Sequence, residues 1–208
     1  MNMEDFFIIH DKVLEKFSKY IQEKELSISR ESLQYNRRWI YKDNSPIEEF
    51  NFGEKEEKIT LDKDDKKILD ELVNDSRKKI VELSEKTKIS VDMITYRIKK
   101  MEQQGIIKGY KCLWNASKLG FTTCKAFVFF KDITEERKKE FINYCKNIDN
   151  SVNIVITFAA WDLEIMFETK DYEEYFRIMD DVKEKFNDVI KFYESVLITS
   201  EPKQVFAK

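Results

Sequence analysis

The segment RIKKMEQQGIIKGYK, residues 97–111, places two of the four glycines of this 208-residue chain within five positions. Gly105 directly follows an amphipathic pattern, where a helix commonly ends in a left-handed residue that glycine adopts at little cost. Gly109 divides the apolar runs of residues 106–114, which is typical of the turn in a β-hairpin. The segment therefore predicts the end of a helix and then a two-stranded ribbon.

Three short helices are predicted upstream of this ribbon. Residues 61–73 carry acids in the first turn and apolar side chains at helical spacing, and residues 76–87 repeat the pattern over a shorter length. Ser90 is expected to cap a third helix over residues 91–104. Three helices and a hairpin form a winged helix-turn-helix, which we assign to residues 61–120.

Downstream of Gly120 the hydrophobic pattern changes to alternating strands and helices. The expected order over residues 121–208 is β-α-β-β-α-β, with Thr134 capping the first helix. Strands are predicted at residues 124–130, 153–157, 162–168 and 190–199, and helices at residues 134–148 and 171–186. This is the order of a ferredoxin-like sandwich with both helices on one face of the sheet, so the fold class is α+β.

The first 50 residues show the pattern of half of such a domain. Residues 1–50 hold apolar strand patterns near residues 6–9 and 33–41 on either side of an amphipathic helix, and the polar residues 51–60 predict a linker. A lone strand-helix-strand leaves strand edges and an apolar helix face in water. Two alternatives follow: the segment pairs with strands of another protomer or domain, or the chain is the later part of a longer tandem protein.

The distribution of charge favours a nucleic-acid partner. The chain has a formal net charge of -3, yet residues 77–111 hold ten lysines and arginines against four acids. A basic face confined to a helix-turn-helix and its wing is the electrostatic footprint of a protein that binds the backbone of duplex DNA. The alternative is a solvated, lysine-rich surface. Because charge and motif coincide here, DNA is the favoured partner.

The third helix indicates which side chains meet DNA. Its inward positions are Ile94, Ile98 and Met101, so the opposite face is expected to enter the major groove. We predict contacts near the base edges from Ser90, Val91, Asp92, Thr95, Tyr96 and Lys99. Phosphate contacts are predicted from Arg97, Lys100, Lys108 and Lys111, and Lys78 and Lys79 complete the predicted DNA-binding set. Asp92 has a second interpretation, as a first-turn acid that only complements the helix dipole.

Composition argues against several other classes. Cys112, Cys124 and Cys145 form no C-x-x-C pair, and His10 is the only histidine, so we expect no metal site, no cofactor and no histidine-dependent catalysis. The glycines make no phosphate-binding loop. The sequence shows neither an apolar run long enough to cross a membrane nor a secretory signal, and the expected compartment is the cytoplasm.

Three motifs between residues 61 and 120 are specific: L-D-x-x-D-x-x-I-L, R-I-x-x-x-E-x-x-G-I-I and N-A-x-x-L-G. They resemble the Lrp/AsnC (feast/famine) family of transcription regulators. The βαββαβ region resembles the effector-binding and oligomerising domain of that family, so the resemblance covers residues 61 to about 200. It implies a homodimer as the minimal unit, often higher oligomers, and amino-acid effectors bound between the ferredoxin-like domains.

One departure from the family pattern concerns the effector. Where family members commonly carry G-D-[YF]-D before the third strand of this domain, the chain has Ala159, Ala160, Trp161 and Asp162. The resemblance implies a site for an amino acid or other small metabolite at these residues and the nearby Thr157. Loss of the glycine and the first aspartate removes a flexible backbone position and a partner for an ammonium group. The alternative is that Trp161 is a packed aromatic residue and Asp162 an acid at the start of a strand, and that neither binds a ligand.

The leading hypothesis is a sequence-specific DNA-binding transcription regulator that is not an enzyme. Two alternatives stay open. Siroheme decarboxylases resemble the same architecture, but they show an R-R-I-G-A-like wing and a histidine near the tetrapyrrole, where this chain reads IIKGYKCL at residues 106–113. The other alternative is a co-regulator that binds a protein or small molecule without DNA.

Overall fold

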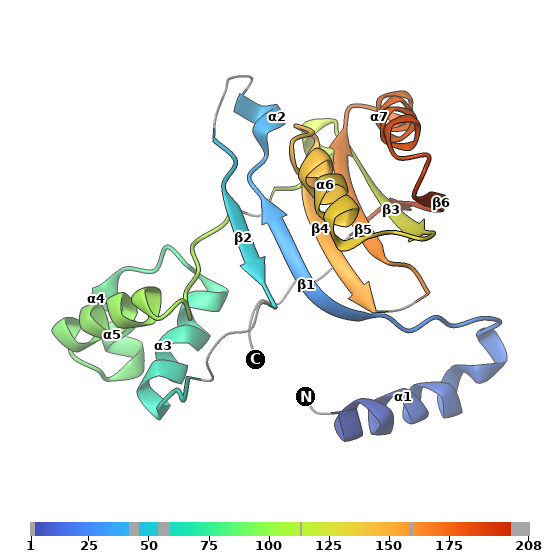
Figure 1. The fold of residues 1–208 in the computed structure, drawn as a ribbon. Coiled ribbons are helices and arrows are strands. Elements are labelled where there is room, and N and C mark those ends of the chain that lie inside the picture. The colour runs from blue at the N-terminus through green and yellow to red at the C-terminus, as the bar shows by residue number, and fades with distance from the viewer. Residues whose placement is uncertain (1–2, 42–45, 54–58, 113, 159, 201–208) are drawn as a thin grey trace.

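The computed structural model describes residues 3–41, 46–53, 59–112, 114–158 and 160–200. Its helices, in chain order, are α1 (Met3–Phe17), α2 (Arg38–Tyr41), α3 (Lys63–Asn74), α4 (Ile80–Thr87), α5 (Val91–Gln103), α6 (Glu135–Lys146) and α7 (Tyr172–Lys185). Its strands are β1 (Ile28–Tyr35), β2 (Glu49–Phe52), β3 (Thr122–Phe130), β4 (Ser151–Phe158), β5 (Leu163–Thr169) and β6 (Ile190–Ile198). Figure 1 shows a helical domain of α3, α4 and α5 beside a sheet domain.

The three helices predicted for the helical domain are confirmed. Asp62 caps α3 in a reciprocal capping box with Asp65, and Ser90 caps α5 by accepting a hydrogen bond from the backbone N–H of Met93. The inward side chains form one core, made of Ile68, Leu72, Leu83, Ile89, Ile94 and Met101. The period of the apolar residues therefore identified the buried faces correctly.

Gly105 ends α5 as the sequence predicts. Its φ is +70°, in the left-handed region. Its N–H donates to the carbonyl of Glu102 at 3.0 Å, and the N–H of Ile106 donates to the carbonyl of Met101 at 2.9 Å. This pair of bonds is the Schellman motif, which satisfies carbonyls that the last turn of a helix leaves without partners.

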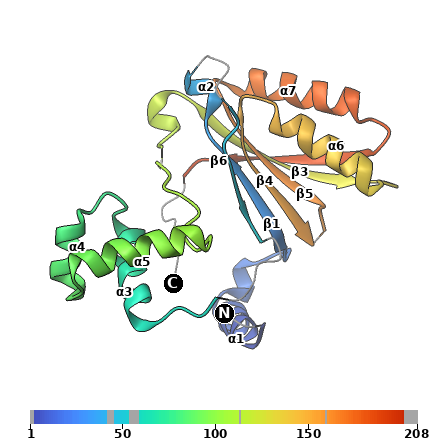
Figure 2. The same cartoon turned by 60° about the vertical axis from the view of Figure 1, so that its left-hand side comes forward.

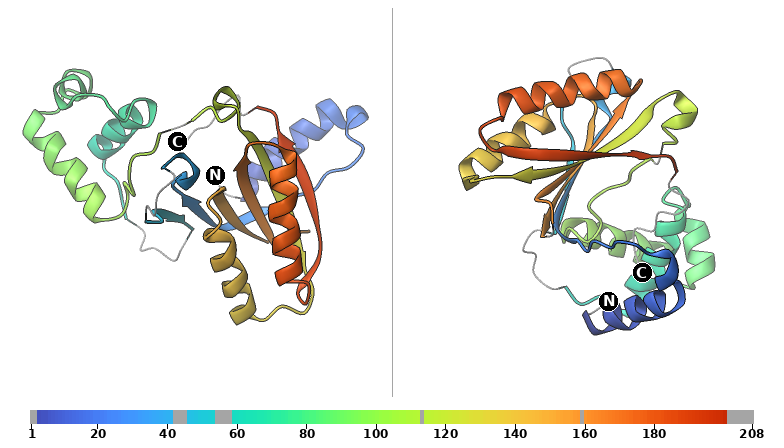
Figure 3. Two further views of the ribbon diagram at one scale, coloured as in Figure 1. Left: turned by 90° about the horizontal axis from the view of Figure 1, so that it is seen from above. Right: turned by 90° about the vertical axis from the view of Figure 1, so that its right-hand side faces the viewer.

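The C-terminal elements confirm the predicted β-α-β-β-α-β order. All pairs in the six-stranded sheet are antiparallel, in the order β2-β1-β4-β5-β3-β6. Helices α6 and α7 lie on the same face of the sheet, as Figure 2 and the right-hand view of Figure 3 show. Residues such as Phe141, Ile165, Phe167, Tyr175 and Phe186 are buried in the core between the helices and the sheet. The opposite face of the sheet carries no helix among the described elements.

The predicted strand-helix-strand order of residues 1–50 is wrong. The structure gives helix, strand, short helix and strand, because residues 6–9 lie inside α1. The acids Glu4 and Asp5 occupy the first turn of that helix, which favours a helical start. A short apolar run cannot be assigned to strand or helix by periodicity alone, and here the flanking acids were the better signal.

The N-terminal segment nevertheless pairs with another domain, as the first of the two alternatives requires. Strand β1 lies antiparallel to β4, and β2 pairs with β1 as the edge strand. Leu33 and Tyr35 bury their side chains in the core of the sheet domain. The predicted boundary between residues 50 and 51 is also wrong, since β2 continues to Phe52; residues 54–58 of the predicted linker lie outside the described residues.

Arg37, just after β1, forms a two-pronged ion pair with Glu168 at the end of β5. Its Nε and one terminal nitrogen each lie 2.7 Å from a carboxylate oxygen of Glu168. The indole N–H of Trp39 donates to the same carboxylate at 3.1 Å. The side chain of Glu168 is only 3% exposed, so its charge depends on these donors for compensation.

Replacing Arg37 with alanine should lower the free energy of unfolding by about 3 kcal/mol, because it leaves a buried carboxylate without its counter-ion. The control is Lys67→Ala, which breaks an ion pair between two exposed side chains, Lys67 and Asp64, and should cost less than about 1 kcal/mol. Urea unfolding followed by circular dichroism measures both. Equal losses for the two variants would contradict the structural role given to Arg37.

Candidate nucleic-acid interface

The exposed face of α5 presents the residues predicted to meet base edges. Ser90, Val91, Asp92, Thr95, Tyr96 and Lys99 are all exposed, and so is Lys100. Tyr96 keeps 63% of its surface in solvent, a large value for an aromatic side chain on a helix. The hydroxyl of Thr95 donates to the carbonyl of Val91 at 2.9 Å, so its donor is already satisfied within the helix. The helix therefore offers a mixed surface of small, aromatic and cationic side chains, the kinds of group that contact base edges and phosphates.

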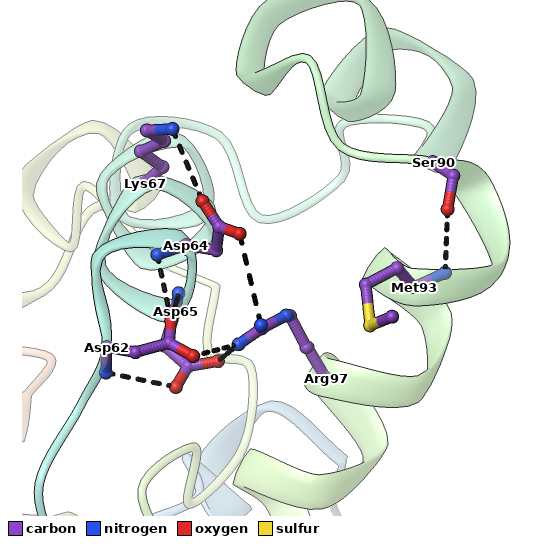
Figure 4. Close-up of polar contacts among 7 residues, drawn as sticks. All are labelled: Asp62, Asp64, Asp65, Lys67, Ser90, Met93 and Arg97. Carbon is purple, nitrogen blue, oxygen red and sulfur yellow. Dashed lines mark hydrogen bonds and ion pairs between the residues drawn. The ribbon is translucent and has the colours of Figure 1, made fainter.

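Arg97, a predicted phosphate contact, binds two carboxylates within the helical domain. One of its terminal nitrogens lies 2.7 Å from Asp62 and 2.7 Å from Asp65, at the start of α3 (Figure 4). The side chain is only 19% exposed. Arg97 thus fixes α5 against the capping box of α3, and its charge is balanced within the domain. In this structure it positions the helix, and the predicted phosphate contact stays a prediction.

The sequence analysis did not identify Asp62 and Asp65 as the partners of Arg97. Their signal is the D-x-x-D spacing of the capping box, which points two acids at one helix start. Hydrogen bonds from the backbone N–H of Asp65 and from Arg97 lower the pKa of Asp62 to about 2. The same two carboxylates raise the pKa of Arg97 further above its already high value.

Lys78 and Lys79, two predicted DNA contacts next to the start of α4, differ in their exposure to solvent. Lys78 donates to the carboxylate of Glu71 on α3, which lowers the pKa of Glu71 and raises that of Lys78. The Lys78 side chain is 9% exposed, so it serves mainly to join α3 to α4. Lys79 is exposed at the N-cap position of α4 and keeps its place in the candidate surface.

The predicted ribbon after α5 is not seen in the described residues 104–112, which include no strand. The segment instead packs against the N-terminal strands. Lys108 donates to the backbone carbonyl of Asn51 in β2, and Lys111 donates to the side chain of Gln34 in β1 at 3.1 Å. These two predicted phosphate contacts therefore meet the sheet domain in this structure.

The turn between β4 and β5 carries the predicted effector residues. Thr157 donates its hydroxyl to the carbonyl of Trp161 at 2.7 Å, and one carboxylate oxygen of Asp162 accepts the N–H of Phe130 at 2.8 Å. The indole of Trp161 packs on Phe127, with ring centroids 4.6 Å apart. Ala160 is exposed, while Ala159 lies outside the described residues. The structure thus brings Thr157, Trp161 and Asp162 together and uses each of them to shape the turn.

Neither metal chemistry nor a membrane span is indicated by the parts of the chain that the structure describes. Those residues contain no group of three or more His, Cys, Asp and Glu side chains arranged to hold a metal ion. Within the same ranges, every helix is too short or too polar to cross a bilayer.

Comparison with known proteins agrees with this fold. Residues 61–108 match the family of winged helix-turn-helix DNA-binding domains. A leucine-responsive regulatory protein of Rhizobium meliloti is 45% identical over 64 residues, which are 31% of this chain and 41% of that protein. The HTH-type transcriptional regulator LrpC of Bacillus subtilis is 34% identical over 119 residues, which are 57% of this chain and 82% of LrpC.

Solved structures show the same architecture. The structure of B. subtilis LrpC aligns with a TM-score of 0.56 at 27% identity and covers 70% of this chain and 99% of that chain. The transcriptional regulator NMB0573 of Neisseria meningitidis, in complex with L-Met, aligns with a TM-score of 0.63 at 21% identity and covers 70% and 94%. More than a quarter of the present chain is therefore unmatched in either structure.

At acidic pH, the free energy of unfolding should depend on the ion pair between Asp62 and Arg97. Because folding lowers the pKa of Asp62 from 3.8 to about 2, its stabilising contribution is complete above pH 3.8 and is lost as the pH falls through 2. Carboxyl NMR titration should give a midpoint near 2, which Arg97→Ala should raise only in part, since the backbone hydrogen bond remains. Arg137→Ala, which breaks an exposed pair with Asp188, is the control. A midpoint for Asp62 that Arg97→Ala leaves unmoved would refute the assignment.

Proposed function

The chain belongs to the Lrp/AsnC family of transcriptional regulators, and we propose that it binds duplex DNA as a two-fold dimer with α5 of each protomer in the major groove of one half-site. The family assignment favours a regulator over the decarboxylase-like alternative. The proposal includes no enzymatic role and puts the protein in the cytoplasm, in contact with DNA.

The single observation that carries the DNA proposal is the exposed face of α5. Arg97 and Lys78 are neutralised inside the domain, yet Lys99 and Lys100 remain exposed on the helix that this motif inserts into DNA. The same face offers Val91, Thr95 and Tyr96 to base edges and thymine methyl groups. We therefore assign sequence readout to the first two turns of α5 and phosphate binding to Lys79, Lys99 and Lys100.

Self-association is supported by the sheet face that lies opposite α6 and α7. Several large apolar side chains on this face are partly or largely in solvent: Phe127, Phe129, Met166, Phe192 and Val196. Phe129 and Phe192 stack on each other with ring centroids 4.1 Å apart, which joins the apolar side chains of β3 and β6 at one end of this face. A surface of this kind favours burial against an identical copy, as a two-fold regulator requires.

The second part of the proposal is an effector, an amino acid or other small metabolite, at the β4–β5 turn. The L-Met complex of the N. meningitidis regulator supports an amino-acid ligand for this architecture. In the present chain, Asp162 is the acid at that turn, and a carboxylate that accepts one backbone N–H can still accept from an ammonium group. The preceding residue, Trp161, adds an aromatic side chain that packs on Phe127.

The test of the DNA proposal begins with duplexes selected by the protein from a random pool. Replacing Lys99 and Lys100 together with alanine should weaken binding to the selected duplex. The plot of log affinity against log salt should become shallower by about 0.9 for each phosphate that the variant no longer neutralises. The control is the double alanine variant of Lys138 and Lys139, which are adjacent on α6. A slope that stays the same in the α5 variant, or failure to enrich any duplex, would sink the proposal.

The effector site is tested by thermal melting with a panel of amino acids. A ligand at about a hundred times its dissociation constant should stabilise the protein by about 2.7 kcal/mol. Asp162→Asn should abolish this gain, because the amide can still accept the N–H of Phe130 but carries no charge for an ammonium group. The control is Asp180→Asn on α7. If no amino acid shifts the melting temperature of the unaltered protein, the proposal of an amino-acid effector at this turn fails.

A further inference from the structure

The N-terminal strands β1 and β2 contact the segment that follows α5, residues 106–112, which we call the connector. Lys108 donates to the carbonyl of Asn51 and also lies over the ring of Phe52, with 5.5 Å between its Nζ and the ring centroid. Lys111 donates to Gln34 in β1. These contacts join the first residues after α5 to two neighbouring strands.

Gly109 of the connector lies against the ring of Phe50 in β2. A Cβ atom placed on it would lie 2.3 Å from Cε1 of Phe50, well inside any real contact distance. The ring of Phe50 therefore packs directly on the backbone of the connector, and only glycine leaves room for it. The glycine that the sequence suggested for a hairpin turn serves a close contact between distant segments.

The same N-terminal segment is fixed firmly to the sheet domain. Strand β1 is hydrogen-bonded along β4, and Arg37 holds the buried Glu168 through two bonds of 2.7 Å. Trp39 packs against Phe121, just before β3, with ring centroids 3.8 Å apart. One side of the segment thus belongs to the core of the sheet domain, while its other side contacts the connector.

We propose that the hairpin of β1 and β2 is a positioning element that sets the orientation of the helix-turn-helix domain on the sheet domain, and thereby the spacing of the two half-sites that a dimer can read. This inference rests on the proposed dimeric DNA binding and adds a determinant of site geometry to it. Phe50, Gln34 and Asn51 act through the connector, without touching DNA.

The hairpin can act as a positioning element because its contacts restrict the conformations of the connector. Described residues 106–112 form neither helix nor strand, so without lateral contacts the connector could adopt many conformations. Each conformation would place α5 differently relative to the two-fold axis of the dimer. Contacts at residues 108, 109 and 111 select one of them, so the two recognition helices present a fixed separation to DNA.

The first experiment measures affinity for a series of duplexes in which two selected half-sites are separated by increasing lengths. The unaltered protein should bind its best spacing at least about tenfold more tightly than a site lengthened by about 5 base pairs, half a helical turn. The double variant Phe50→Ala, Gln34→Ala should lose most of this preference, with affinity for a single half-site and its salt dependence unchanged. Phe158→Ala, an exposed phenylalanine at the far end of β4, should keep the preference.

A second measurement is independent of DNA. Spin labels on cysteines introduced at Glu85 in α4 and Lys183 in α7, with Cys112→Ser, report the distance between the two domains when labelled protein is diluted into unlabelled protein. The distribution should be narrow in the otherwise unaltered chain and broad in the Phe50, Gln34 variant, with circular dichroism showing that both remain folded.

The outcomes separate the two proposals. A retained spacing preference together with a narrow distance distribution in the variant overturns the positioning role and leaves the DNA proposal standing. If the unaltered protein binds no paired site, the proposed dimeric DNA binding fails, and the inference about spacing fails with it. A narrow distribution that broadens in the variant would then show only that the hairpin orders the two domains.

Discussion

The pairing of β1 with β4 is the interaction on which the rest of the arrangement depends. Without β1, strand β4 would end the sheet with a row of backbone donors and acceptors in water, a template for uncontrolled association. With β1 in place, Leu33 and Tyr35 extend the buried core, and Arg37 reaches Glu168. The pairing also brings β2 to the position where it meets the connector. One edge contact therefore links the interior of the sheet domain to the DNA-binding domain.

Within the helical domain, charge is divided between stability and recognition. Asp62 and Asp65 already stabilise the start of α3 by capping its free N–H groups, and the same carboxylates bind Arg97 of α5. A guanidinium suits this task because its planar donors can serve two acceptors at once. Helix α5 is held by a polar contact at Arg97 and by the buried side chains of Ile94 and Met101, and its remaining face is open to solvent.

The sequence predicted the helices and strands of residues 61–103 and 122–200 well, because local signals agree there with the tertiary structure, but it also predicted a ribbon after α5 that the described residues 104–112 do not form. Ser90, Gly105 and Thr134 fall at helix ends with the expected capping interaction or conformation, and exposure along α5 follows from helical periodicity. The failures have two physical causes, which are a short pattern that fits two structures and a deciding partner outside the local pattern. Residues 6–9 suit a strand or a helix equally. The partners of Arg97 lie more than thirty positions away along the chain, where periodicity carries no information.

Counting cations therefore overstates the charge that a DNA-binding surface offers. Of the basic residues between positions 77 and 111, Arg97 and Lys78 have carboxylate partners within the domain, and Lys86 lies 3.3 Å from the same Glu71 that binds Lys78. The amines of Lys108 and Lys111 meet oxygen atoms of the N-terminal strands. Since counterion release depends on the phosphates neutralised, and not on the formal charge of a segment, few lysines are left to drive binding. In the dimer proposed above, the phosphate contacts of two protomers add together, so the fixed placement of the two α5 helices becomes as important as the charge on either one.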